Sequence, residues 1–117
     1  MIESVPRELL PLLADRLRAL ADPLRLEVMA LLRDGERTIG ELATALGASQ
    51  PTVTRQIDRL EASGWVARRR AGARVYVRLA DHVSEGLCSC LCEMVRGQAA
   101  DLAQRVGLPA GVRSDEA

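Results

Sequence analysis

The sequence predicts a mainly helical α+β fold, and three observations support this prediction. Apolar residues recur at three- and four-residue steps over residues 9–60, as on one face of a helix, and alternate with polar residues over 65–79, as in strands. Aromatic residues make up 2% of the chain, so the core must be filled by Leu, Val, Ala and Met, a composition that favours helices. The length of 117 residues suits one compact domain, expected over 1–107, followed by a flexible tail over 108–117.

The first helix is expected between Pro6 and Pro23, over about ten to fourteen residues, because leucines recur there at helical spacing. These leucines are Leu9, Leu10, Leu12, Leu13, Leu17 and Leu20. Asp22 and Pro23 form the pattern of an N-cap followed by proline at the first helical position, so a second helix is expected to begin there. Gly35 is expected to end it.

Two short helices follow, joined by a tight turn at Gly47–Ala48. Thr38 is expected to cap the first of them, and Glu41 three residues later completes the pattern of a capping box. Ser49 is expected to cap the second, which stops at Ser63–Gly64. Two short helices joined by a turn that contains glycine form a helix-turn-helix.

After these helices the apolar period shortens to two. Residues 65–70 and 74–79 contain the strand-favouring residues Val and Tyr and flank the segment 71–73, which contains a glycine, so a β-hairpin is expected. A last helix is expected from position 82 to about 105. The chain is therefore expected to contain five helices and one hairpin.

The positive charge is concentrated in the middle of the chain, although the formal net charge of the whole is zero. Residues 1–46 hold six arginines and eight acids, residues 47–80 hold seven arginines and two acids, and residues 81–117 hold three arginines and six acids. The helix-turn-helix and the hairpin thus share a local excess of five positive charges. Such an excess suits a nucleic-acid partner.

A helix-turn-helix followed by a basic hairpin is the order of a winged helix, which suits recognition of double-stranded DNA. The second helix of the pair presents polar side chains away from its apolar stripe of Val53, Ile57 and Leu60. Gln and Arg pair with adenine and guanine edges, whereas arginines of the hairpin suit phosphates and the minor groove. The expected DNA-binding residues are Ser49, Gln50, Thr52, Thr54, Arg55, Gln56, Arg59, Arg68, Arg69, Arg70 and Arg74. The alternative, a merely solvated polar face, is disfavoured by the adjoining arginines.

Four segments of the chain resemble the ArsR/SmtB family of bacterial repressors. They are Leu20–Leu26, Gly47–Thr54, Leu60–Val66 and Val75–Leu79, and the resemblance covers about residues 15–80. The resemblance implies a homodimer joined through its first and last helices, with two recognition helices in successive major grooves of an inverted-repeat operator. It also implies that an inducer weakens DNA binding and so releases repression.

The inducer sites of that family are where this sequence departs from the pattern. Metal-sensing members often carry Cys-x-Cys at the start of the third helix, where this chain has Thr38-Ile39-Gly40. Another family site uses Asp and His residues of the last helix, for which this chain offers Asp81 and His82 without the later partners. A zinc or nickel site of either type is therefore not expected.

A cluster of three thiols, Cys88, Cys90 and Cys92, stands instead near the start of the last helix. At 100° per residue, Cys88 and Cys92 lie about 40° apart on one flank, while Cys90 points to the other side. Three sulfurs of one regular helix therefore cannot close on one ion. The remaining arrangements are a Cys88–Cys92 site completed from elsewhere, an unwound helix start, or a contribution of Cys90 next to the partner chain.

Thiolates select soft ions, so the expected inducer is As(III) or Sb(III), with Cd(II), Pb(II) and Hg(II) as further candidates and no organic cofactor. A rival interpretation is thiol oxidation or persulfide sensing. The plainest alternative is that the three cysteines are small apolar fillers.

Other classes of protein find little support in the sequence. One His, no Lys and no glycine-rich phosphate loop leave acid–base and nucleophilic catalysis without residues, so the chain is not expected to be an enzyme. A protein-interaction module that does not bind DNA is opposed by the basic hairpin. The odd number of cysteines and the absence of a long apolar run predict a cytoplasmic protein with no membrane partner.

Overall fold

The structure, a computed structural model, describes residues 5–81, 83 and 85–107, and for 85–92 the backbone alone. The tail expected at 108–117 lies outside the described residues. The chain divides into two compact units, Met1–Asp81 and His82–Ala117. The single domain expected over 1–107 stays a prediction.

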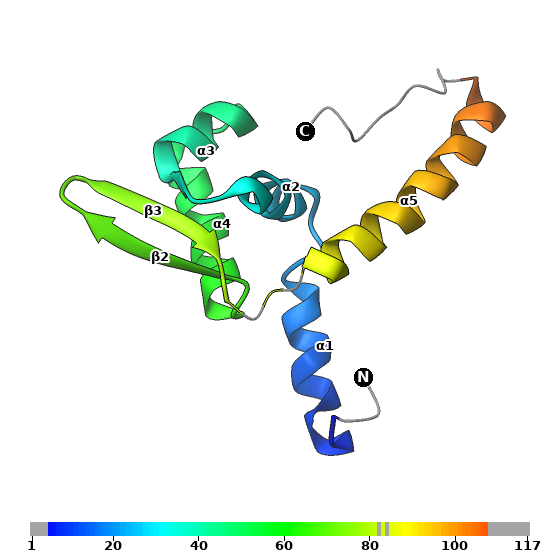
Figure 1. Cartoon of the computed structure of the whole chain (residues 1–117), viewed down its shortest axis with the longest axis horizontal. Coiled ribbons are helices and arrows are strands. Elements are labelled where there is room, and N and C mark those ends of the chain that lie inside the picture. The colour runs from blue at the N-terminus through cyan, green and yellow to red at the C-terminus, as the bar shows by residue number, and fades with distance from the viewer. Residues whose placement is uncertain (1–4, 82, 84, 108–117) are drawn as a thin grey trace. The chain divides into compact units, whose positions relative to one another are not determined.

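The first unit contains four α-helices and three strands, and the second contains one helix within the described residues (Figure 1). The helices are α1 (Leu10–Arg18), α2 (Pro23–Leu31), α3 (Ile39–Leu46), α4 (Gln50–Ala62) and α5 (Glu85–Val106). Short 3₁₀ turns, η2 (Arg7–Leu9) and η3 (Leu32–Asp34), precede α1 and follow α2. The strands are β1 (Arg37–Thr38), β2 (Val66–Ala71) and β3 (Arg74–Leu79). The prediction of five helices and a hairpin is confirmed, although α1 itself has nine residues, fewer than expected.

Local hydrogen bonds begin three of the helices as the sequence predicts. The carboxylate of Asp22, the hydroxyl of Thr38 and the hydroxyl of Ser49 each accept from the backbone N–H three residues further on, at 3.1, 3.0 and 3.2 Å. The carboxylate of Glu41 in turn accepts from the backbone N–H of Thr38 at 2.8 Å, which completes the capping box. These contacts satisfy N–H groups that have no partner inside the helix.

The three strands form one antiparallel sheet in the order β1-β3-β2. Ala71 pairs with Arg74, so the hairpin turn has two residues and not the three expected. Gly72 in this turn has a φ of +64°, a conformation that favours glycine. The short strand β1 was not predicted, because two residues carry no recognisable alternation. We call the β2–β3 hairpin the wing; Figure 1 shows it leading away from the end of α4.

The core of the first unit lies between the helix-turn-helix, α2 and the sheet. Its fully buried side chains are Val28, Leu42, Val53, Ile57, Leu60 and Val77. The predicted apolar stripe of α4 is thus confirmed. Helix α1 contributes no buried residue over its whole length, although four of its nine residues are leucines.

Candidate nucleic-acid interface

The face of α4 opposite its buried stripe carries most of the residues expected to bind DNA. Gln50, Arg55 and Arg59 are exposed there, whereas Thr52 and Thr54 are half-buried. The side chain of Arg59 makes no hydrogen bond or ion pair within residues 5–81. The helix therefore presents long polar side chains to solvent from a backbone that is anchored in the core.

A short hydrogen-bonded chain orders the N-terminal half of this face. The exposed hydroxyl of Ser49 donates to Oγ1 of Thr52 at 2.9 Å, and the guanidinium of Arg55 donates to the same oxygen at 3.2 Å. A threonine hydroxyl accepts two hydrogen bonds and donates one, so Thr52 keeps its donor for an outside acceptor. The chain also limits the orientations open to the Arg55 side chain.

Gln56, another expected contact, is partly committed inside the protein. Its Oε1 atom accepts from the guanidinium of Arg25 in α2 at 2.9 Å, and the side chain is half-buried. Arginine has no acceptor, so the amide oxygen must face Arg25 and the amide nitrogen is left for other partners. Bidentate pairing with adenine uses both amide atoms, so the Gln56 oxygen would have to accept from adenine through its second lone pair while it still accepts from Arg25.

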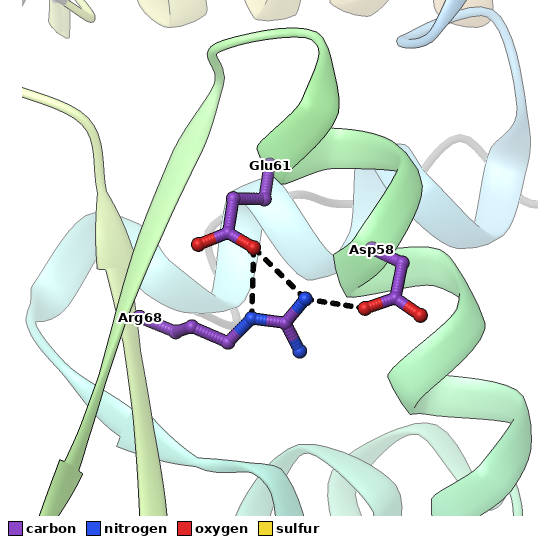
Figure 2. Close-up of polar contacts among 3 residues, drawn as sticks. All are labelled: Asp58, Glu61 and Arg68. Atoms are coloured by element: carbon purple, nitrogen blue, oxygen red, sulfur yellow. Dashed lines mark hydrogen bonds and ion pairs between the residues drawn. The ribbon is translucent and has the colours of Figure 1, made fainter.

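Arg68 of the wing is paired with two acids of α4 (Figure 2). Its Nε donates to Oε1 of Glu61 at 2.9 Å, one terminal nitrogen lies 2.8 Å from the same oxygen, and that nitrogen also donates to Oδ1 of Asp58. The hydrogen bonds to Asp58 and then to Glu61 raise the pKa of Arg68 above its ordinary value. This guanidinium was expected to contact phosphate, yet it faces two carboxylates.

Arg69, the next residue of the wing, is paired as well. Its Nε and one terminal nitrogen donate to the two carboxylate oxygens of Glu36 at 2.9 and 2.8 Å, a bidentate geometry. Its guanidinium carbon lies 4.4 Å from the centroid of the Tyr76 ring. The hydrogen bonds from Arg69 are the main cause of the lowered pKa of Glu36, and the same bonds raise the pKa of Arg69.

The remaining wing arginines that were expected to bind DNA, Arg70 and Arg74, are exposed. The side chain of neither residue makes an ion pair or a hydrogen bond within residues 5–81. The arginines of the basic segment are therefore of two kinds. Some are paired with acidic residues, and others have side chains with no acidic partner within residues 5–81.

An open groove of about 700 Å³ connects the start of α3 with α4 and the wing. It is lined by Arg37, Thr38, Gly40, Glu41, Thr44, Ala45, Gln50 and Arg74. The groove brings together two of the expected residues, Gln50 and Arg74, which lie far apart in the sequence. Arg37 and Thr44 were missed by the sequence analysis, since no local pattern relates them to the wing.

The described side chains do not form a metal-binding cluster. No group of three His, Cys, Asp or Glu residues there is placed to hold an ion. Asp81 lies 2.8 Å from the guanidinium of Arg78, and Thr38 caps α3. The range of α5 includes Cys88, Cys90 and Cys92, whose side chains lie outside the described residues, as does His82. Within the part of the chain that the structure describes, no helix has the length and apolar character needed to cross a membrane.

The fold and this face define a winged helix-turn-helix protein of the transcription-regulator class. The sequence model described as "Bacterial regulatory protein, arsR family" matches residues 22–68. The solution structure of the homodimeric winged helix-turn-helix DNA-binding domain of Mb0332 from Mycobacterium bovis is similar, with a TM-score of 0.65 and 33% identity over 78% of this chain and 83% of that one. The chain belongs to the ArsR/SmtB family, which places it among transcriptional regulators and not enzymes.

Two curated relatives illustrate the similarity. The HTH-type transcriptional repressor SmtB of Mycobacterium tuberculosis is 43% identical over 77 residues, which are 66% of this chain and 57% of that protein. The arsenical resistance operon repressor of Escherichia coli is 39% identical over 67 residues, which are 56% of this chain and 57% of that protein. The matches thus span little more than half the length of these relatives.

Proposed function

We propose that this protein is a homodimeric transcriptional repressor that binds double-stranded operator DNA with inverted-repeat symmetry. The observations that carry the proposal are the exposed side chains of Arg55 and Arg59 on α4 and the exposed wing arginines Arg70 and Arg74, whose side chains have no ion-pair partner within residues 5–81. Helix α4 enters the major groove as the recognition helix, and the wing lies along the adjacent backbone. Membership of a regulator family supports this arrangement.

The expected contacts divide by chemistry. Gln50, Thr54 and Arg55 face base edges, and Thr52 donates to a base acceptor or a phosphate oxygen. Gln56 contributes its amide nitrogen while its oxygen stays with Arg25. The phosphate contacts come from side chains with a free charge or a free hydroxyl: Ser49, Arg59, Arg70 and Arg74.

The dimer forms through α1 and α5. Leu9, Leu12 and Leu17 are 47, 49 and 44% exposed, and α1 buries none of its residues within the described structure. On α5, Val95 and Leu102 are 58 and 56% exposed. A second copy of the chain would cover these side chains, and a twofold axis is the usual way in which two identical apolar faces meet. The homodimeric relative from M. bovis supports this reading.

The inducer is a thiophilic ion bound by thiolates of the Cys88, Cys90 and Cys92 cluster, with As(III) or Sb(III) favoured over Cd(II), Pb(II) and Hg(II). Because α5 is helical from Glu85 to Val106, the ion is held either by Cys88 and Cys92 with a ligand from elsewhere, or with Cys90 contributing next to the partner chain. The chemistry of the donor set carries this part, because thiolates bind soft ions far better than hard ones. The name of the E. coli relative, an arsenical resistance operon repressor, supports the same class of ion. An ion bound on α5, a helix of the dimer seam, would shift the spacing of the recognition helices, with a coupling of about 1–3 kcal/mol.

The experiment is fluorescence anisotropy of labelled DNA from upstream of the gene, titrated with fully reduced protein at several salt concentrations. If the dimer neutralises roughly six to eight phosphates, the logarithm of affinity should fall against the logarithm of salt with a slope of about −5 to −7. A slope near zero would overturn the proposal that the protein binds DNA.

The inducer is tested by adding arsenite, antimonite, cadmium, zinc or an organic persulfide to the preformed complex. Release by a thiophilic ion that is lost when all three cysteines are replaced by serine supports the metal site. The Ser89→Ala variant is the matched control, since it alters the same stretch of helix without removing a thiol, and it should respond as the parent does. Release by persulfide alone, reversed by reductant, would replace the metal by thiol chemistry as the signal, and no release by any of them would leave the cysteines as packing residues.

A further inference from the structure

Two consecutive arginines hold the wing from its two faces. Successive side chains of a strand point to opposite faces of the sheet, so Arg68 and Arg69 leave β2 in opposite directions. Arg68 meets Asp58 and Glu61 of α4, whereas Arg69 meets Glu36, the residue before β1. Asp58 and Glu61 are three residues apart and therefore share one side of their helix.

The local charge around Arg68 is unfavourable for a phosphate. One guanidinium stands against two carboxylates, at 2.8 Å from Glu61 and in contact with Asp58, and its side chain is 26% exposed. A phosphate would have to displace both acids or approach a site with net negative charge. Figure 2 shows the guanidinium lying between the two carboxylates and the strand.

We call the contacts of Arg68 with Asp58 and Glu61, and of Arg69 with Glu36, the clamp; it lies where the wing leaves the core. Val66 at the start of β2 is buried, whereas the residues from Arg69 to Ala71 are exposed. The turn that joins α4 to β2 contains Gly64, whose φ is +83°. On β3 the buried Val77 lies opposite Arg68 and pairs with β1, so it anchors the wing in the core as Val66 does. Beyond the Arg68–Val77 pair, the position of the wing depends on polar contacts and on strand pairing.

We propose that Arg68 and Arg69 are positioning residues, of which Arg68 fixes the wing relative to α4 and Arg69 fixes it relative to the segment before β1, while Arg70 and Arg74 supply the phosphate contacts of the wing. The inference deepens the proposed function and rests on it. Loss of a clamp residue leaves the final contacts with DNA in place, but the wing must then be ordered on binding. Loss of a free arginine removes one phosphate contact from each protomer.

The test compares Arg68→Gln, Arg69→Gln, Arg70→Gln and Arg74→Gln as matched substitutions, each checked for folding by its amide NMR spectrum. Arg68→Gln and Arg69→Gln should bind operator about three- to ten-fold more weakly with an unchanged salt slope, as expected for added ordering. Arg70→Gln and Arg74→Gln should each reduce the magnitude of the slope by about 1.8, for two phosphates per dimer. A slope reduced by Arg68→Gln as much as by Arg70→Gln would overturn the clamp.

A second readout needs no DNA and so separates failure of the clamp from failure of the proposed function. Amide order parameters at Ala71, Gly72 and Ala73 in the free protein should fall in Arg68→Gln and Arg69→Gln and stay unchanged in Arg70→Gln. The double variant Asp58→Ala/Glu61→Ala should lower them as Arg68→Gln does, and combining it with Arg68→Gln should add nothing. Unchanged order at the wing tip in these variants would overturn the proposal even if the protein binds DNA.

Discussion

The indole N–H of Trp65 donates to the backbone carbonyl of Arg16 across 2.8 Å. The guanidinium of Arg16 donates in return to the backbone carbonyl of Ala62 at 3.2 Å. These two contacts join α1 to the end of α4 and to the residue that precedes the wing. These hydrogen bonds link α1, which is proposed to form the dimer, with α4 and the wing, which are proposed to bind DNA.

Replacing Trp65 by Phe should lower the free energy of unfolding by about 1 kcal/mol, because the ring is largely kept but the hydrogen bond to Arg16 is lost. Urea denaturation followed by circular dichroism measures the change. Tyr76→Phe is the control, since the Tyr76 hydroxyl makes no hydrogen bond within the described residues, and it should change stability little. Equal stability of Trp65→Phe and the parent would show that the bond to Arg16 contributes nothing.

Replacing Thr38 by Ala should cost about 1 kcal/mol of stability, because the capping hydroxyl that accepts from the N–H of Glu41 is removed. The backbone pairing of β1 with β3 does not depend on that hydroxyl. Thr44→Ala, on the exposed side of the same helix, is the matched control and should stay within about 0.5 kcal/mol of the parent. Thermal unfolding of the three proteins decides whether the cap acts as described.

The stability contributed by the ion pair between Glu36 and Arg69 depends on pH. The pKa of Glu36 is lowered below its ordinary value of 4.5, so its contribution to stability is fully present above pH 4.5 and is lost as the pH falls through the lower folded value. A carboxyl-carbon NMR titration should show a midpoint below 4.5 in the parent. Arg69→Gln should move it upward, and an unmoved midpoint would assign the shift to another cause.

Replacing Arg55 by Ala should cost about 1–3 kcal/mol on the best operator and relax base preference at one position, as expected for a base contact. Binding to random DNA should change much less. Anisotropy with a panel of single-base variants of the operator measures both quantities, and Arg33→Ala, in η3 and outside α4, the wing and the two dimer helices, serves as control. A uniform loss on all DNA would make Arg55 a phosphate contact.

The sequence predicts well those elements whose sequence patterns, such as a helix cap or an apolar stripe, lie within a short stretch of the chain. The cap at Ser49 and the stripe of Val53, Ile57 and Leu60 lie within one helix, and each is confirmed. Strand β1 was missed because its existence depends on residues of β3 about forty positions away in the chain, where Thr38 pairs with Tyr76.

The candidate site shows the same division between local and distant information. A count of charge along the sequence treats Arg68, Arg69 and Arg70 alike, because they are neighbours in one strand. Their partners differ: Arg68 has acids on α4, Arg69 has an acid 33 residues earlier, and Arg70 has none within residues 5–81. The alternation of side chains along a strand predicts that neighbouring arginines point in opposite directions. Which acidic residues lie next to each face of the strand is decided only by the tertiary structure.

Thr38 pairs with β3 as part of β1 and also caps α3, so this single residue connects the three-stranded sheet to the helix-turn-helix. The far end of β3 is closed in a similar way, where the N–H of Ala80 donates to the carbonyl of Trp65 at 3.0 Å. An engineer who wished to transfer the DNA preference of this protein to a relative would gain little by grafting α4 alone. The smallest exchangeable cassette that keeps both contacts runs from Arg37 to Ala80, because it contains the strand pairing and helix cap of Thr38 as well as the Trp65–Ala80 hydrogen bond.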